Sequence, residues 1–242
     1  MKEYVCNESG LVKKAKYAVA IDGPSGAGKS SLAKALAAKL GISYVDTGAI
    51  YRTVGYAVRQ HGISGDDKEG VVALLDKIKV DARFEDGKQY MYLDGECLGE
   101  KIRENEISAY ASKVAAIPEV RTFLLEMQRK IARENSVIMD GRDIGTVILP
   151  DAEVKIFLSA TAEKRAKRRY LELIERGENP DYDQILIEIK ERDLRDSSRD
   201  VAPLRPADDA VLLDNSEISL EATVDAAEEI IRSKLPAVCT AR

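Results

Sequence analysis

Short apolar runs rich in β-branched residues recur along the chain, and most are followed by a segment with helical spacing. Strands joined through helices in this way are typical of a parallel sheet. The pattern therefore predicts an α/β fold with a parallel sheet flanked by helices. The predicted strands are Tyr17–Ile21, Ser43–Val45, Val137–Met139, Val154–Leu158 and Val211–Leu213.

Four helices have clear start or stop signals in the sequence. Glycine or proline follows the last apolar position in most of them, and a serine that can cap precedes one. The predicted helices are Ser30–Leu40 before Gly41, Ala162–Arg176 before Gly177, Tyr182–Arg195 after Pro180, and Ser219–Leu235 between the cap Ser219 and Pro236.

The stretch 62–100 breaks the alternation of strands and helices. Polar and apolar positions alternate there around Asp86-Gly87, a pair typical of hairpin turns, so we predict a small α+β insert. The predicted division is an N-terminal extension at 1–16, a core at 17–61 and 101–235, the insert at 62–100, and a C-terminal tail at 236–242.

The composition and charge of the chain mainly exclude classes of function. A chain of 242 residues with 45% hydrophobic content can bury the core of one α/β domain. The net charge of -5 and a pI near 5.3 argue against a general nucleic-acid binder, which needs a basic surface. No apolar run approaches the roughly 18 to 20 residues of a membrane span, and the polar N-terminus lacks the apolar core of a signal peptide. We therefore expect a cytoplasmic protein without membrane or nucleic-acid partners.

The cysteines and the histidine offer no metal or redox site. Cys6, Cys97 and Cys239 are far apart and odd in number, so we expect them to be reduced, structural residues. His61 is the only histidine, which excludes a two-histidine metal site and leaves a Ser-His-Asp triad resting on one residue of a Gly-rich turn. We expect His61 in a surface loop.

A phosphate-binding motif lies between the first predicted strand and helix. Gly23–Ser30, "GPSGAGKS", fits the pattern G-x-x-x-x-G-K-[ST] in the context that it requires. Glycines let backbone N–H groups surround a phosphate, and the helix N-terminus adds positive potential. Lys29 would reach the β- and γ-phosphates, and the Ser30 hydroxyl would bind Mg²⁺. The alternative is a plain glycine turn.

Polar segments at two strand ends indicate a second anion site. No asparagine precedes a lysine, so the N-K-x-D motif of a GTPase is absent. The segment "VDTGAIYR" instead supplies Asp46, Thr47, Tyr51 and Arg52, and "MDGRDIG" supplies Asp140, Arg142 and Asp143. Ligands of open parallel sheets bind at the carboxyl ends of strands, so both segments should face the phosphate loop.

Two arginine-rich runs remain to be placed. In "KERDLRDSSR", Arg192, Arg195 and Arg199 are spaced by three and four residues, so one helix face or its end can present all three to phosphates. The alternative is a solvated helix face. The run "EKRAKRR" is either an exposed surface paired with Glu172 and Glu175, or the base of a lid whose Arg165 or Arg169 touches ATP.

Several segments together resemble the bacterial-type cytidylate kinase family of P-loop nucleoside monophosphate kinases. They cover about residues 17–235 in the family's order and are "DGPSGAGKSSLAKALA", "YVDTGAIYR", "ASKVAAIPEVR", "VIMDGRDIGTVILPDAEVKIFLSA", "EIKERDLRDSSR" and "APLRPADDAVLLD". The resemblance implies a fold like adenylate kinase: a five-stranded parallel core, a monophosphate-binding insert at 62–100, and a short lid and arginine-rich region at about 165–200.

The resemblance also implies site residues. ATP would be held by Gly23, Pro24, Ser25, Gly26, Ala27, Gly28, Lys29, Ser30 and Ser31. The monophosphate would be bound by Thr47, Tyr51, Arg52, Ser112, Arg121, Arg142, Asp143, Arg192, Asp196 and Arg199, and catalysis would rest on Lys29, Arg142, Arg192 and Arg199.

Roles within this set follow the family. Arg52, Arg142 and Arg199 would bind the acceptor phosphate, Asp196 with Arg192 the ribose, and Ser112, Arg121 and Asp143 the base. Cytosine offers an amino donor beside two acceptors, so a carboxylate and a guanidinium complement its edge, whereas uracil would set its O4 acceptor against the carboxylate.

The expected function is transfer of the γ-phosphoryl of Mg²⁺-bound ATP to CMP and dCMP, giving ADP and the diphosphate. One alternative is another pyrimidine monophosphate kinase that favours UMP. An alternative of a different class is a binding or regulatory module that uses ATP only to change shape. We expect a monomer.

Overall fold

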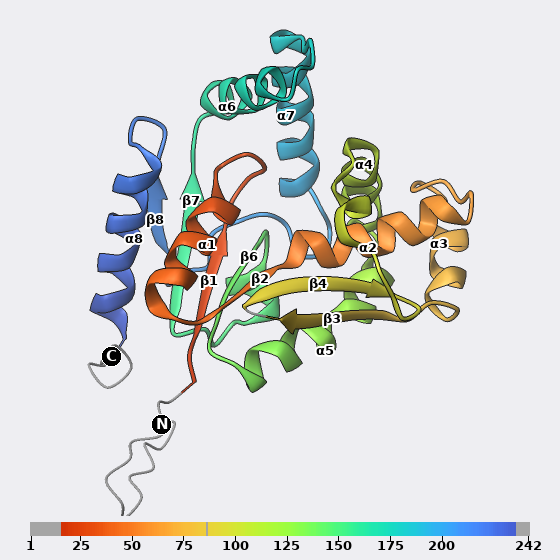
Figure 1. The fold of residues 1–242 in the computed structure, drawn as a ribbon, viewed down its shortest axis with the longest axis horizontal. Helices are drawn as coiled ribbons and strands as arrows, with labels where there is room; N and C mark the ends of the chain where they lie inside the picture. Colours follow the sequence, from red (N-terminus) through yellow and green to blue (C-terminus); the bar gives the residue numbers. More distant parts are fainter. Residues whose placement is uncertain (1–15, 86, 236–242) are drawn as a thin grey trace, which may run out of the picture.

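The computed structural model describes residues 16–85 and 87–235. Its centre is a five-stranded parallel sheet with strand order β2-β6-β1-β7-β8 (Figure 1). All five predicted strands are confirmed, with small shifts at their ends. The strands are β1 (Ala18–Asp22), β2 (Ser43–Asp46), β6 (Val137–Gly141), β7 (Val154–Ser159) and β8 (Val211–Asp214).

Helices lie on both faces of this sheet (Figure 1). Their bounds are α1 (Lys29–Leu40), α2 (Thr47–Gln60), α3 (Lys68–Leu75), α4 (Asn105–Val114), α5 (Pro118–Glu134), α6 (Ala162–Glu175), α7 (Tyr182–Ser197) and α8 (Leu220–Lys234). The four helices predicted from their start and stop signals are confirmed. Gly41 ends α1 in the left-handed region with φ 65°, and the Ser219 hydroxyl accepts the Ala222 N–H at the start of α8.

Alternate residues of the central strands build two separate cores. Val19 and Ile21 of β1 pack with residues of α1 and α8, whereas Ala20 joins the core formed with α2 and α5. All of these side chains are fully buried. Apolar residues therefore fill both faces of the strand that leads into the phosphate loop, which fixes the start of that loop.

The stretch 62–100, predicted to be an insert, forms α3 and a small antiparallel sheet beside α2 (Figure 1). Its strands are β3 (Val80–Glu85), β4 (Lys88–Leu93) and β5 (Glu96–Cys97). The predicted hairpin is confirmed, because Glu85 pairs with Lys88, and Gly87 takes φ 73° in the turn. Asp86 lies outside the described residues.

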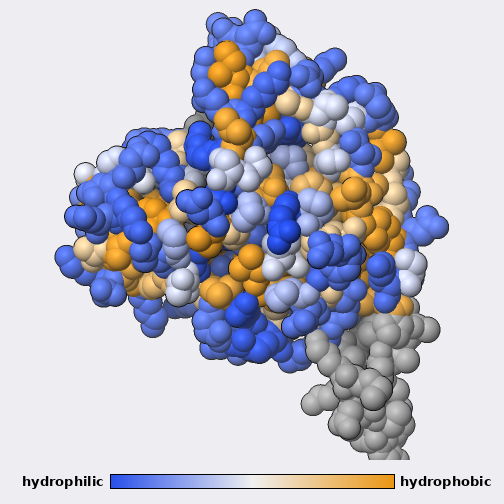
Figure 2. All heavy atoms as spheres, turned by 180° about the vertical axis from the view of Figure 1, so that it is seen from behind, coloured by the Kyte–Doolittle hydropathy of each residue, from blue (hydrophilic) through white to orange (hydrophobic). Residues whose placement is uncertain are grey.

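Helices α6 and α7 form a pair that projects from the sheet (Figure 1). Ala166, Leu173, Ile185 and Ile189 give the pair a small core of its own. Figure 2 shows apolar residues on the surface of this projecting part. Its exposed large apolar side chains are Leu171, Ile174, Ile187 and Leu194.

The histidine and one cysteine lie on the surface. His61 is exposed in the turn after α2, as predicted. Cys97 is free as expected but exposed on β5, and Cys6 and Cys239 lie outside the described residues. None of the helices in residues 16–85 and 87–235 has the length and apolar character needed to cross a membrane.

Candidate active site

The loop between β1 and α1 is shaped to surround an anion. Gly26 and Gly28 have φ values of 76° and 90°, and a Cβ at Gly23 would lie 2.0 Å from the Leu158 carbonyl oxygen. Helix α1 begins at Lys29 with no side-chain cap, which leaves its first N–H groups available to a ligand. The geometry is therefore that of a phosphate loop.

Lys29 is buried inside this loop. Its Nζ donates to the Pro24 carbonyl at 2.7 Å, and its side chain is only 5% exposed. Burial, together with the nearby Arg142 guanidinium, holds the pKa of Lys29 well below its usual range. The negative charge of a ligand at this position would stabilise the buried Lys29 ammonium and offset the repulsion from Arg142.

Ser30 lies against a carboxylate that the sequence analysis had not assigned a role. The Ser30 hydroxyl donates to Asp140 Oδ2 at 2.9 Å, and the Tyr44 hydroxyl donates to Asp140 Oδ1 at 2.9 Å. Burial raises the pKa of Asp140 to about 6, and the neighbouring Asp46 carboxylate adds to the shift. The sequence signal that could have indicated this contact is the position of Asp140 at the end of a predicted strand, β6.

The pair Ser30 and Asp140 fits Mg²⁺, which prefers oxygen donors and usually takes one or two carboxylates together with substrate phosphates. Within the described ranges, no cluster of three or more His, Cys, Asp or Glu side chains could hold a metal by itself. The donor set therefore suits an ion shared with a phosphate ligand.

Three arginines gather around Asp196 at the end of α7. Arg142 Nε donates to Asp196 Oδ2 at 2.9 Å, and Arg199 pairs with Asp196 Oδ1. Although burial alone would raise the pKa of Asp196, the Arg142 and Arg199 guanidiniums hold it below its usual range. Arg199 of the arginine-rich run thus belongs to this cluster, whereas Arg195 is exposed and donates to the Ser112 hydroxyl.

Arg192 is the third arginine, and it lacks a counter-ion of its own. Its Nε is buried without a hydrogen-bond partner, and it forms no salt bridge with any residue of 16–85 and 87–235. Burial, with the charge of Arg142, lowers the pKa of Arg192 to about 10. Three guanidiniums share one carboxylate, so the cluster has a net positive charge that an anionic ligand can neutralise.

Arg52, in the second turn of α2, pairs with Asp46 at the end of β2. Its Nη2 donates to Asp46 Oδ2 at 2.9 Å, and its Nε is buried with no partner among the described residues. Thr47 is buried, and its hydroxyl donates to the Asp140 carbonyl at 2.7 Å. Thr47 therefore joins the ends of β2 and β6, while Arg52 keeps donors for a ligand.

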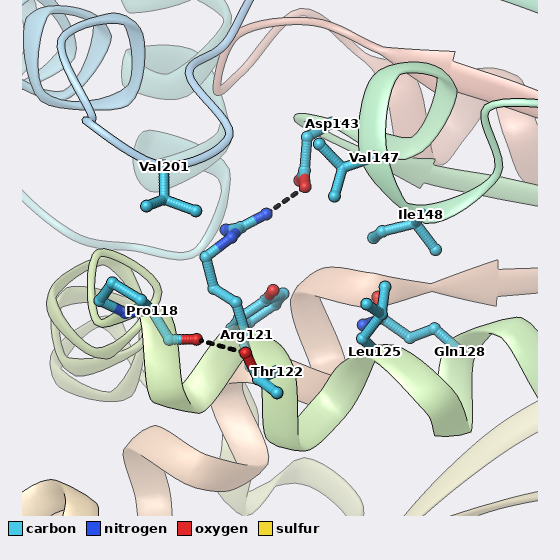
Figure 3. A pocket seen from close by; sticks show the side chains of 10 residues that line it. Pro118, Arg121, Thr122, Leu125, Gln128, Asp143, Val147, Ile148 and Val201 are labelled. Carbon is cyan, nitrogen blue, oxygen red and sulfur yellow. Dashed lines mark hydrogen bonds and ion pairs between the residues drawn. The ribbon is translucent and has the colours of Figure 1, made fainter.

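A buried ion pair joins α5 to the segment after β6. Arg121 pairs with Asp143 Oδ2, and both side chains are less than a tenth exposed. Figure 3 shows Arg121 rising from α5 toward Asp143. Both residues line a cavity of about 130 Å³. Tyr51 and the buried Gln128 also line this cavity, and the Arg121 guanidinium carbon lies 5.7 Å from the centre of the Tyr51 ring.

Ser112 contacts a different arginine. It is buried on α4, and its hydroxyl accepts from Arg195 Nη1 of α7 at 3.3 Å. No hydrogen bond between Ser112 and Arg121 or Asp143 is formed in the described part of the chain. The structure thus brings together two of the three residues predicted to contact the base.

Comparison with known proteins decides the family. The family model described as cytidylate kinase matches residues 19–233. This chain belongs to the cytidylate kinase family. A cytidylate kinase of Caldicellulosiruptor bescii is 52% identical over 206 residues, covering 85% of this chain and 91% of the relative. The cytidylate kinase of Pasteurella multocida is 46% identical over 220 residues, covering 91% of this chain and 97% of the relative.

Solved structures resemble this cytidylate kinase family member in fold alone. An uncharacterized protein from Eubacterium ventriosum matches with a TM-score of 0.50 and 15% identity, covering 90% of this chain and 99% of that chain. Shikimate kinase from Bacteroides thetaiotaomicron matches with a TM-score of 0.46 and 13% identity, over the same shares of both chains.

Two arginines of α6 bind the phosphate loop from outside. Arg165 is buried, forms two hydrogen bonds with the Asp193 carboxylate of α7, and donates to the Ser25 carbonyl at 3.0 Å. Arg168 donates to the Asn215 side chain at 3.1 Å and to the Ala27 carbonyl at 3.4 Å.

These contacts concern the run "EKRAKRR", for which the sequence left two placements: an exposed helix surface or the base of a lid. Arg169 pairs with Glu172, as expected for a helix surface. Arg165 instead is buried and donates to the Ser25 carbonyl of the phosphate loop. Sequence analysis missed the partners Asp193 and Asn215, because nothing in their local sequence signals a contact with residues 28 or 47 positions away.

Proposed function

We propose that this protein transfers the γ-phosphoryl group of ATP to the phosphate of CMP and of dCMP, giving ADP and CDP or dCDP. The observation that carries the proposal is the unpaired guanidinium of Arg192, which lies with Arg142 near Lys29 of the phosphate loop. Buried cations that outnumber their carboxylate partners need an anionic ligand, and two phosphorylated substrates supply it. Membership of the cytidylate kinase family supports the same reaction.

On the ATP side, the phosphates bind the backbone N–H groups of Gly23–Ser31 and the Lys29 ammonium. Lys29 exchanges its bond to the Pro24 carbonyl for phosphate oxygens. Ser30 and Asp140 would hold Mg²⁺, which neutralises charge on the phosphates when it is bound.

On the acceptor side, Arg52, Arg142 and Arg199 bind the monophosphate. The acceptor phosphate is already ionised near neutral pH, so the reaction needs no strong base. Arg192 and Lys29 neutralise charge on the group in transfer, and catalysis consists of alignment and charge neutralisation. Movement of the projecting α6–α7 pair toward the substrates excludes water as a competing acceptor.

Cytosine is recognised by the ion pair of Arg121 and Asp143, together with Ser112 of α4. Asp143 accepts from the amino group of the base, and Arg121 donates to N3 or O2. Asp196 with Arg192 binds the ribose hydroxyls, and Tyr51 forms a wall of the site. The same proposal includes the division of the chain into core, insert and lid, a monomeric state and a cytoplasmic location.

A coupled assay of ADP release tests the function. ATP, Mg²⁺ and the protein are incubated with CMP, dCMP, UMP or no acceptor. We expect ADP release that depends on CMP or dCMP and is much slower with UMP. Faster turnover with UMP would establish the other pyrimidine kinase, and ATP binding without acceptor-dependent ADP release would establish a binding module.

A further inference from the structure

Gln89 connects the insert to the start of α2. It is the second residue of β4 and is half-buried. Its Oε1 accepts the Asp46 N–H at 2.7 Å, and its Nε2 donates to the Asp46 carbonyl at 3.3 Å. These two partners fix which end of the amide is oxygen, because an N–H needs an acceptor and a carbonyl needs a donor. One side chain therefore holds both peptide groups of Asp46.

Asp46 in turn holds two groups of α2 through its carboxylate. Oδ1 accepts the Ala49 N–H at 2.8 Å as the cap of the helix, and Oδ2 accepts from Arg52 at 2.9 Å. A Cβ at Gly48 would lie 2.9 Å from Arg52 Nη1 and 3.0 Å from Asp46 Oδ1. The absence of a side chain at Gly48 leaves room for this pair, so the orientation of Asp46 sets that of Arg52.

Arg52 has hydrogen-bond donors available beyond its contact with Asp46. Its Nε is buried without a hydrogen bond, and one planar guanidinium can face two carboxylate or phosphate groups at once. A guanidinium held on one side by Asp46 loses less rotamer freedom when it binds a phosphate on its other side.

We propose that Gln89 is a positioning residue for the acceptor phosphate: it fixes Asp46, and Asp46 orients Arg52, so the insert contributes to monophosphate affinity without touching the ligand. This inference rests on the proposed function, in which Arg52 binds that phosphate. The hydrogen bonds of this chain of contacts run from Gln89 of β4 to Asp46 and from Asp46 to Arg52.

The test is the variant Gln89→Leu, which keeps the approximate volume and removes both hydrogen bonds. We expect the KM for CMP to rise roughly fivefold to twentyfold, because Arg52 is no longer held in place for the phosphate, while the KM for ATP stays close to wild type. Gln89→Glu retains an acceptor for the Asp46 N–H but has no donor for its carbonyl, so it should also raise the KM for CMP. Lys88→Leu, at the exposed neighbouring position, is the matched control and should change neither KM.

A double variant identifies the route of the effect. If Gln89 acts through Arg52, Gln89→Leu combined with Arg52→Ala should have the same KM for CMP as Arg52→Ala alone. An unchanged KM for CMP in Gln89→Leu, additive effects in the double variant, or parallel rises of both KM values with a lowered Tm would each overturn the inference. Failure of the wild type to phosphorylate CMP would instead overturn the proposed function, so the two failures are distinguishable.

Discussion

Lys29 and Arg192 form no salt bridge within residues 16–85 and 87–235, although the carboxylates of Asp140 and Asp196 lie in their respective fields. Burial lowers the pKa of both groups, and each is also in the field of Arg142. Such an arrangement costs folding free energy, because a buried cation loses its hydration. Its cost is offset when phosphates enter, so the same residues that strain the free protein are those expected to stabilise the transferring phosphoryl group.

Lys29→Met is the simplest test of that expectation. It removes the ammonium and keeps most of the side-chain volume, so turnover should fall by about 10³ or more while the Tm stays equal or rises. Steady-state kinetics and thermal unfolding measure the two effects. Lys39→Met, at an exposed position of the same helix, should leave turnover unchanged. Near-native turnover of Lys29→Met would remove Lys29 from catalysis.

Base choice is predicted to depend on Asp143. Asp143→Ala removes the acceptor for the cytosine amino group, so the ratio of kcat/KM for CMP over UMP should fall by roughly tenfold to a hundredfold. The loss should come from CMP, because UMP gains nothing from the carboxylate. Arg52→Ala is the control, since a phosphate contact should affect both substrates alike. An unchanged ratio in Asp143→Ala would mean that Asp143 only orients Arg121.

At the scale of elements, α6 and α7 are joined to the rest of the molecule through polar side chains and have an apolar core of their own. Their own core is small, and Arg165 joins them to each other through Asp193 and to the phosphate loop through the Ser25 carbonyl. A unit with little buried apolar area opens at lower free energy than the sheet does. Of the arginines expected to surround the phosphates, Arg192 lies on α7 and Arg199 follows the end of that helix.

The rates of amide hydrogen exchange should therefore differ between these helices and the sheet. We expect amides of α6 and α7 to exchange faster than those of β1 and β6 in the free protein. Addition of ATP with CMP should slow exchange in α6 and α7 more than in α8, which lies away from the site. Equal protection of α6, α7 and the central strands before ligand addition would contradict this account.

The stability of the whole molecule depends on how β1 is joined to the segment after β6. The buried Asp22 carboxylate accepts the N–H groups of Ile144 and Gly145 at 2.8 and 2.7 Å. Burial nevertheless raises the pKa of Asp22 from 3.8 to about 6. The folded state thus binds a proton at Asp22 more tightly than the unfolded chain does. This contribution to stability is complete below pH 3.8 and is lost as the pH rises through about 6.

The variant Asp22→Asn makes this dependence measurable, because it cannot titrate. The free energy of unfolding of the wild type minus that of Asp22→Asn should decrease between pH 4.5 and pH 7, by at most about 3 kcal/mol for a pKa difference of about two units. Urea unfolding at both pH values gives the difference. Asp151→Asn, at an exposed position, should show little change. A difference for Asp22→Asn that is constant with pH would show that its pKa is not raised.

Local sequence was sufficient for much of this architecture. The five strands follow from β-branched apolar runs, and the ends of α1 and α8 follow from Gly41 and Ser219, because burial patterns and caps act over a few residues. The phosphate loop is also contiguous, so its motif determines its conformation. Recognition of the family likewise needed only the order of short segments.

Tertiary structure alone decided the pairing of side chains that are distant in sequence. Arg121 meets Asp143 because α5 packs beside the end of β6, and Arg165 meets Asp193 because α6 and α7 lie against each other. Gln89 reaches Asp46 only because the insert folds back beside α2. A charged residue has many partners of opposite charge in the sequence, and the chain brings one of them within reach only when the apolar faces of its elements have packed.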